Sequence, residues 1–429
     1  MIVLLRQTLV ALLVLPSLAA GWEFRGETGL EGRYFTQASP YEAADYSTNS
    51  SLYLKGEVFH EWNNRDDQFI FIPYARVDEN DSERTHADIR ELSWIHVGSG
   101  WESRVGIRKV FWGVTEGRHL VDIINQTDLV DQVDGEEKLG QPMLNLSTVR
   151  DWGIVDLFVL PGFRERTYAG EEGRPRTPLP VSDHARYESG AEDKRVDVAF
   201  RYQQYFNNGL ELALSHFSGT SREPLLLPEA LSPQQLQSLL LTGSLPAGSD
   251  PELVPLYNVI DQTGLELQYL NNGWLWKLEA ITRSGQGDRF TALDGGFEYT
   301  QVGVLDSAAD LGWLLEYLWE DRDALLASPF QDDVLLATRF TFNDVASTEI
   351  LAGVIYDLEN DEKAINLESS RRFGNNLKAS LEARFYTDTA KPLSASELYL
   401  SALQGRAENP GLSPVSRSDF IQAEVVYYF

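Results

Sequence analysis

Two groups of residues with opposite charges have spacings that suit a site which orients solutes electrostatically and does not break covalent bonds. Carboxylates that face guanidinium groups across a narrow gap create a transverse field, which orients dipolar solutes and favours small ions and polar metabolites. The alternative is that the acids lie in a solvated loop while each arginine pairs with a neighbouring glutamate, and the sequence leaves both open. The basic group is Arg25, Arg33, Arg76, Arg104 and Arg108, with Glu102 on the same face; the acidic group is Asp122, Asp128, Asp131, Asp134, Glu136 and Glu137.

A second pattern, Ser215-His-Phe-Ser-Gly219, offers nucleophilic chemistry because His216 and Ser218 lie two apart on one strand face. A serine so placed can attack an acyl ester while the histidine takes its proton. The pattern resembles the His-x-Ser arrangement of outer-membrane phospholipases. However, no Asn follows Ser218 as in that family, and no residue is identified that would orient His216. A histidine at the membrane interface is the favoured interpretation.

No other residue pattern indicates a metal or a cofactor. The remaining histidines, at positions 60, 86, 96, 119 and 184, lack metal-ligand spacing, and the chain contains no cysteine. No phosphate-binding glycine loop, nucleotide fingerprint or redox motif is present. The formal net charge of −29 argues against nucleic-acid binding.

The charged residues alternate with apolar ones, which requires strands with one wet face and one apolar face. In residues 101–108, Trp101, Val105 and Ile107 alternate with Glu102 and Arg104. The first strand likewise places Arg25 and Arg33 opposite Trp22 and Phe24. The strand near residue 90 breaks the pattern, because either Arg90 or Glu91 would face lipid. We therefore expect a β-bulge or an interface position there.

Short turn signals recur between the alternating stretches. Asn and Gly tolerate the positive φ angles of tight hairpins, and Leu270-Asn-Asn-Gly-Trp274 is one of eight such turns. Eight short turns on one side and longer connections on the other predict an all-β, transmembrane antiparallel up-and-down barrel of eighteen strands, with sixteen as the alternative. The expected strands are 22–36, 50–62, 68–78, 87–97, 101–111, 142–150, 153–161, 193–206, 209–219, 257–270, 273–284, 289–304, 311–321, 332–343, 348–358, 363–373, 376–387 and 418–429.

Both ends of the chain indicate export to a membrane. Residues 1–20 have one basic residue, an apolar stretch and a small-residue exit, which predicts a cleaved signal peptide before a single barrel domain at 21–429. The last strand ends with Tyr427 and Phe429 on its apolar face. It resembles the closing strand of Gram-negative outer-membrane β-barrels, which the barrel-assembly machinery reads. The resemblance implies an outer-membrane location with lipid and lipopolysaccharide around the barrel. A secreted β-sandwich, propeller or solenoid is the alternative fold.

A further resemblance concerns residues 85–165. Lys109-Val-Phe-Trp-Gly113, Val121-Asp-Ile-Ile-Asn125, Asp151-Trp-Gly and Leu160-Pro-Gly-Phe163 are similar to a segment of a little-characterised porin-like family. The connection 112–141 also resembles the inward-folded constriction loop of general porins by position and acidity. Within it, residues 117–130 have spacing compatible with a short amphipathic helix. Two more short helices are expected, after Ser232 and over 395–403, as a lid or on the barrel rim.

These observations predict a porin-like channel for passive diffusion of small polar or charged solutes, without enzymatic activity and without a cofactor. A carrier for a hydrophobic substrate is one alternative. An enzyme acting on lipid, or a structural barrel, is another. The sequence does not indicate whether the barrels form trimers.

Overall fold

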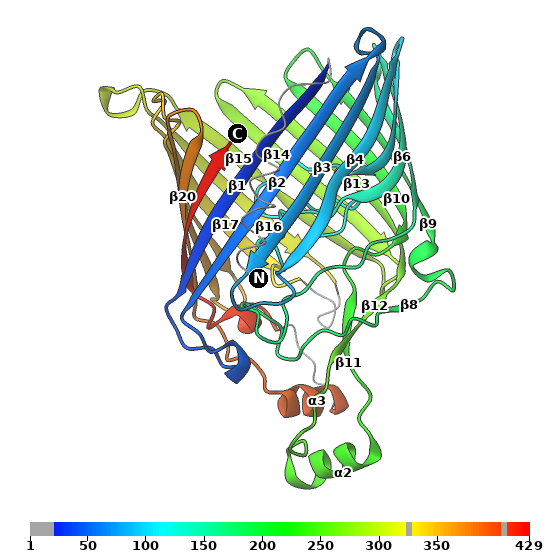
Figure 1. Cartoon of the computed structure of the whole chain (residues 1–429), viewed down its shortest axis with the longest axis vertical. Helices are drawn as coiled ribbons and strands as arrows, with labels where there is room; N and C mark the ends of the chain where they lie inside the picture. The colour runs from blue at the N-terminus through cyan, green and yellow to red at the C-terminus, as the bar shows by residue number, and fades with distance from the viewer. Residues whose placement is uncertain (1–20, 323–327, 405–409) are drawn as a thin grey trace, which may run out of the picture.

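The computed structural model describes residues 21–322, 328–404 and 410–429, and in them eighteen antiparallel strands form one closed barrel (Figure 1). The predicted signal peptide lies outside the described residues. The first barrel strand pairs with both the second and the last, so no sheet edge remains open. None of the described helices is long and apolar enough to cross a membrane. The eighteen-strand prediction is confirmed, and the alternative of sixteen is wrong.

The strand bounds agree with the predicted ranges to within a few residues. The barrel strands are β1 (Trp22–Phe35), β2 (Thr48–Trp62), β3 (Asp67–Asp78), β4 (His86–Gly98), β5 (Trp101–Arg108), β6 (Gln141–Arg150), β7 (Gly153–Pro161), β9 (Val196–Tyr205), β10 (Leu210–Thr220), β13 (Val259–Asn271), β14 (Trp274–Ser284), β15 (Phe290–Gln301), β16 (Asp310–Glu320), β17 (Asp332–Thr341), β18 (Glu349–Asp357), β19 (Lys363–Phe373), β20 (Leu377–Thr387) and β21 (Phe420–Tyr428).

The eight predicted turns join strands at one end of the barrel, at the top of Figure 1. Asn272 and Gly273 form a two-residue turn between β13 and β14 with φ of 52° and 82°. Two consecutive positive φ angles match the right-handed twist of the flanking strands, which explains the Asn-Gly sequence. β1 begins at this end and β21 finishes there, and the longer connections leave the opposite, external end.

The external connections carry elements of their own. A three-stranded sheet is formed by β8 (Arg186–Tyr187), β11 (Leu225–Pro228) and β12 (Leu253–Tyr257), which the sequence did not predict. The two predicted external helices are present as α2 (Pro233–Thr242) and α3 (Ala395–Leu403), at the bottom of Figure 1. Short 3-10 helices are η1 (Glu42–Ala44), η2 (Asn63–Arg65), η3 (Glu192–Lys194), η4 (Val304–Asp306) and η5 (Ser413–Val415).

Each external helix has a sequence-encoded start. Ser232 and Gln235 form a capping box for α2, and Ser394 and Glu397 form one for α3. The two helices share an apolar cluster in which Leu239 and Tyr399 are buried. The two helices therefore pack together as one external unit rather than as two independent lids.

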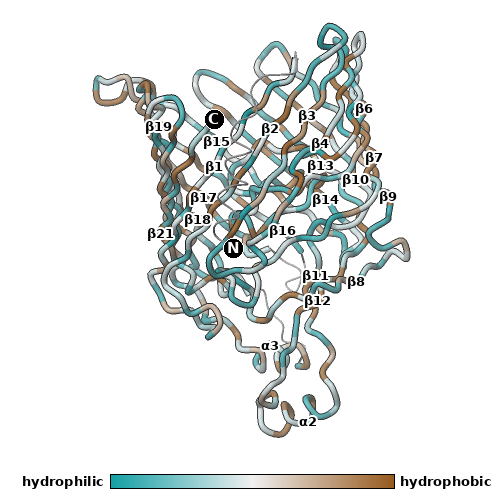
Figure 2. Tube along the Cα trace, in the orientation of Figure 1, coloured by the Kyte–Doolittle hydropathy of each residue, from teal (hydrophilic) through white to brown (hydrophobic). Residues whose placement is uncertain are grey.

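The two faces of the strands differ as the alternation predicts, and Figure 2 shows hydrophobic and hydrophilic residues interleaved along the barrel wall. On β1, Leu30 is 59% exposed on the outside, whereas Glu31 and Arg33 on the lumen side are 4% and 6% exposed. Lipid contact suits the outer residues, while the inner ones need polar partners.

The irregularity expected near residue 90 is a β-bulge. The β3–β4 register shifts between Ile72 and Pro73, whose partners are Glu91 and Ile89, so Arg90 has no partner across the ladder. The extra residue lets both Arg90 and Glu91 point inward, and Arg90 is only 2% exposed. The sequence conflict is resolved without placing a charge in lipid.

The backbones of β15 and β16 approach each other closely at Gly296, which allows a test of the fold. A Cβ added at Gly296 would overlap the carbonyl oxygen of Leu315, whereas one added at Gly312 would lie 3.6 Å from the carbonyl oxygen of Arg339. We predict that Gly296→Ala lowers the free energy of unfolding in detergent by about 1–3 kcal/mol, because the strands must separate. Urea titration measures it. Equal effects of Gly296→Ala and Gly312→Ala would contradict this packing.

Candidate functional site in the lumen

The connection between β5 and β6, residues 109–140, lies inside the barrel and contacts the wall opposite its origin. Its residues 114–118 face the lumen side of β14, β15 and β16, where three carboxylates are at most 1% exposed: Glu279, Asp294 and Glu316. Buried carboxylates need hydrogen-bond donors or cations. The loop backbone supplies the donors.

Five consecutive amides of this segment donate to these carboxylates, an arrangement we call the amide clamp. Glu279 Oε1 accepts two of them and the hydroxyl of Thr115, while Glu279 Oε2 accepts the amide of Val121 at 3.2 Å. The five bonds are Val114 and Thr115 to Glu279 (2.6 and 3.0 Å), Glu116 and Gly117 to Glu316 (2.9 and 2.7 Å), and Arg118 to Asp294 (2.8 Å).

The predicted helix over residues 117–130 is wrong. In this stretch the chain forms turns and isolated bridges. Its apolar residues are buried as expected, with Val121 and Ile124 fully covered, but they pack against strand residues such as Phe217 and Ile281. The amide of Val121, which would bond to the carbonyl of Gly117 in a helix beginning there, donates to Glu279 instead. The apolar cluster therefore lies between the loop and the inner faces of β6, β7, β9, β10 and β13–β15.

Ion pairs hold residues 128–131 of the loop against the barrel wall. Arg90 donates to Asp128 and Asp131 at 2.6 Å each, and Arg76 lies 2.8 Å from Asp131. The hydroxyl of Tyr74 also donates to Asp131 at 2.7 Å. Burial would raise the pKa of Asp128, but Arg90 and Thr167 hold that pKa below its ordinary value. We call this group the arginine anchor.

The basic residues singled out in the sequence do not act as one wall. Arg76 contacts the loop, and Arg33 bonds to Glu31 and Gln422 on its own side of the barrel. The other three pair with nearby glutamates, as the alternative interpretation expects: Arg25 with Glu23 at 2.6 Å, Arg104 with Glu102, and Arg108 with Glu91 at 3.7 Å.

The remaining loop acids have cations of their own. Asp134 reaches Arg384 on β20 at 2.9 Å, which carries the loop across to the strands near the barrel closure. Burial raises the pKa of Asp122 to about 6, although Lys138, 3.4 Å away, opposes the rise. Two further pairs complete the set: Glu136 with His119 at 3.2 Å and Glu137 with Lys109 at 2.8 Å. The predicted acids therefore sit mostly in ion pairs rather than facing an open gap.

A passage remains beside the loop. A cavity of about 480 Å³ lies between loop residues 131–134 and the inner faces of β1, β3 and β17–β21. Its lining is polar and includes Arg33, Lys378, Ser380 and Glu424 among others. Of the predicted pore-lining residues, Arg33 and Arg76 reach it, whereas Arg25, Glu102, Arg104 and Arg108 are not among its lining residues. The pore-lining role of each stays a prediction.

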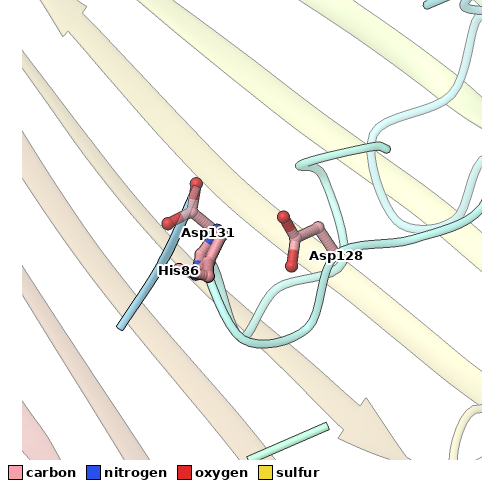
Figure 3. Close-up of side chains that lie close together, drawn as sticks. All are labelled: His86, Asp128 and Asp131. Carbon is pink, nitrogen blue, oxygen red and sulfur yellow. The ribbon is translucent and has the colours of Figure 1, made fainter. Parts of the chain in front are cut away.

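One group has metal-like spacing. His86, Asp128 and Asp131 place potential ligand atoms within 4.8 Å of one another (Figure 3). Arg90 already donates to both carboxylates, so a guanidinium neutralises the charge that a metal ion would otherwise neutralise. This group belongs to the arginine anchor.

The possible hydrolytic pair lies on the outer face of the barrel. The side chain of His216 is 53% exposed, its Nδ1 is 3.0 Å from Thr263 Oγ1, and its Nε2 is 4.0 Å from Asp261. No hydrogen bond in the described part of the chain joins His216 to Ser218. The serine therefore lacks the activating contact that nucleophilic catalysis requires.

Sequence reasoning missed the residues that hold the loop. Glu279 and Asp294 were not singled out, although they alternate with apolar neighbours. Arg84, which donates to the carbonyls of Val130 and Asp131 in the loop, was not singled out either. Their partners are backbone groups or residues far away in the chain, such as Val114, which lies 165 positions before Glu279. A backbone amide carries no sequence signature, so only the alternation could have pointed to these carboxylates.

Comparisons with known proteins rest on the shape of the barrel. No family model matches the sequence, and no curated protein matches it. A BenF-like porin from Pseudomonas fluorescens Pf-5 aligns over 95% of this chain and 97% of its own, with a TM-score of 0.53 and 11% identity. The fold is that of a porin-like outer-membrane β-barrel. OccK3 (OpdO) from Pseudomonas aeruginosa aligns over 95% of both chains, with a TM-score of 0.49 and 11% identity. A mutant of Rh. blastica porin covers 95% of this chain and 100% of its own, with a TM-score of 0.41 and 11% identity.

The amide clamp gives a first prediction for the porin-like barrel. Glu279→Ala should leave several buried amides without acceptors, at about 1–3 kcal/mol for each unsatisfied group, and release the loop. We expect larger and noisier single-channel currents in planar bilayers. Glu211→Ala is the control, because Glu211 lies on the lumen side of β10 without a described contact to the loop. Steady currents of unchanged size in Glu279→Ala would contradict the clamp.

The arginine anchor gives a second prediction. Arg90→Met should lower the free energy of unfolding by about 3–5 kcal/mol, because the buried Asp128 loses its cation and Asp131 keeps only Arg76. The triple variant Arg90→Met, Asp128→Asn, Asp131→Asn should recover much of this loss. Urea unfolding in detergent measures both. The control is Arg25→Met, whose exposed ion pair should contribute under about 1 kcal/mol; a similar loss there would count against the anchor.

Proposed function

We propose that the protein is a passive outer-membrane channel for small polar or charged solutes. The observation that carries the proposal is the polar cavity of about 480 Å³ between the loop and the strands near the barrel closure. Its position inside a closed porin-like barrel supports a route for solutes, since strands of this kind keep one face wet. Diffusion through such a route needs no moving part.

The loop supports a size limit on that route. The apolar cluster around Val121 and Ile124 occupies the lumen beside β7, β10 and β13–β15, so solutes are confined to the other side of the loop. On that side, loop residues 131–134 form one boundary, and Asp134 is fixed to Arg384. The proposed constriction is therefore made by the tip of the loop and the β18–β21 wall, which would admit only small solutes.

A bulky residue in the passage tests the proposal. We expect stepwise conductance from purified protein in planar bilayers, and a reduction of about twofold or more in Ser380→Trp, because Ser380 lines the cavity. Ala379→Trp is the matched control, since its partner across the ladder, Val425, is 43% exposed on the lipid side. A barrel that stays closed would reject the channel. Conductance equally reduced in both variants would reject this passage as the route.

A further inference from the structure

A second cavity, of about 460 Å³, lies on the external side of the loop, and we call it the vestibule. It is enclosed by the β3–β4 connection, by loop residues 164–171 and 180–183, and by residues before β13. Asp128 and Val130 line the vestibule, whereas Asp131–Asp134 line the inner passage. The anchored loop segment therefore lies between the two cavities.

The vestibule carries an excess of negative charge that its own cations do not neutralise. Its two arginines are Arg164, which pairs with Asp88 at 2.9 Å, and Arg166, which donates to Gln126. Five acids on its lining have no ion-pair partner within the described residues. Glu165 accepts a hydrogen bond from the hydroxyl of Tyr187, and the other four are Glu83, Glu171, Asp183 and Glu252. They come from three connections that are distant in sequence, so the fold gathers them around one space.

The acids are close enough to influence one another. Burial raises the pKa of Glu83, and the nearby negative charges of Asp183, Asp81 and Glu172 raise it further. Like charges that oppose each other's ionisation produce a negative potential in the space between them. A narrow cavity with low-dielectric walls focuses that potential and raises the local concentration of cations.

The lining of the inner passage also has more unpaired acidic side chains than unpaired basic ones. Its arginines on β1, β3 and β20 each lie within ion-pair distance of a carboxylate. By contrast Glu349, Glu368 and Glu424 have no ion pair among the described residues, and the unpaired base on this lining is Lys378. The charges left free along both cavities are thus mainly negative.

We propose that the channel selects cations over anions, and that Glu83, Glu171, Asp183 and Glu252 of the vestibule set this selectivity. The inference rests on the proposed channel function and adds its solute class: inorganic cations and small solutes of net positive charge. The four acids act on solutes before these reach the constriction. Rings of acidic side chains have this effect in cation channels.

Reversal potentials under a potassium chloride gradient test the proposal. Wild type should show a potassium-to-chloride permeability ratio above about 3, and the variant Glu83→Gln, Glu171→Gln, Asp183→Asn, Glu252→Gln should lower it at least about twofold. The difference should be larger at about 0.1 M than at about 1 M salt, because the Debye length falls from about 10 Å to about 3 Å.

A variant with the same change in net charge is the control. Glu229→Gln, Asp250→Asn, Asp288→Asn, Glu359→Gln alters four exposed external acids that do not line the vestibule. We expect its permeability ratio to stay near the wild-type value. Conductance without cation preference, or equal shifts in both variants, would overturn the inference while leaving the channel intact. Absence of conductance in wild type would instead reject the channel function itself.

Discussion

The barrel depends on one pairing, that of β1 with β21. In hydrocarbon no water is present to satisfy backbone groups, so a sheet can span the membrane only if it has no edge. Nine residue pairs join these two strands, and Gly26 and Phe429 exchange hydrogen bonds of 2.9 Å beyond them. The terminal aromatic residue is therefore part of the closure itself, since its backbone completes the ladder. A role as an assembly signal is compatible with that position and stays a prediction.

Closure creates an inner surface whose charges must find partners, and the long loop supplies many of them. The β14–β16 wall presents carboxylates, which bind backbone amides of the loop; the β3–β4 wall presents arginines, which bind its carboxylates. The two walls thus hold opposite ends of one segment by complementary chemistry. The two ends could not exchange walls. The loop amides and the arginines are both hydrogen-bond donors, and the loop carboxylates would be repelled by Glu279 and Glu316. The path of the loop follows from this polarity.

Much of the fold could be predicted from the sequence because its determinants are local. The alternation in residues 101–108 and the Asn-Gly turn at position 272 depend on neighbours in the chain, and even the bulge at Arg90 was visible as a charge that could not face lipid. The loop was different. Its acidity and position resembled those of an inward-folded loop but left a solvated external loop open, and the spacing of Leu120, Ile123 and Ile124 suggested a helix. Glu279, far away in the sequence, accepts the amide of Val121 that a helix would have used, and no periodicity reports such a contact.

The loop also changes what the charges of the lumen can do. A transverse field between an acidic loop and a basic wall requires opposite charges that stay apart. Asp131, however, lies within 2.8 Å of both Arg76 and Arg90. Charges this close form ion pairs whose electric fields largely cancel a few ångströms away. Charges used to fix the loop therefore contribute little to the field in the passage. In the proposed channel, a solute would meet the remaining charges, such as Glu349, Glu368 and the vestibule acids. Selectivity would then be governed by the residues that folding leaves unpaired.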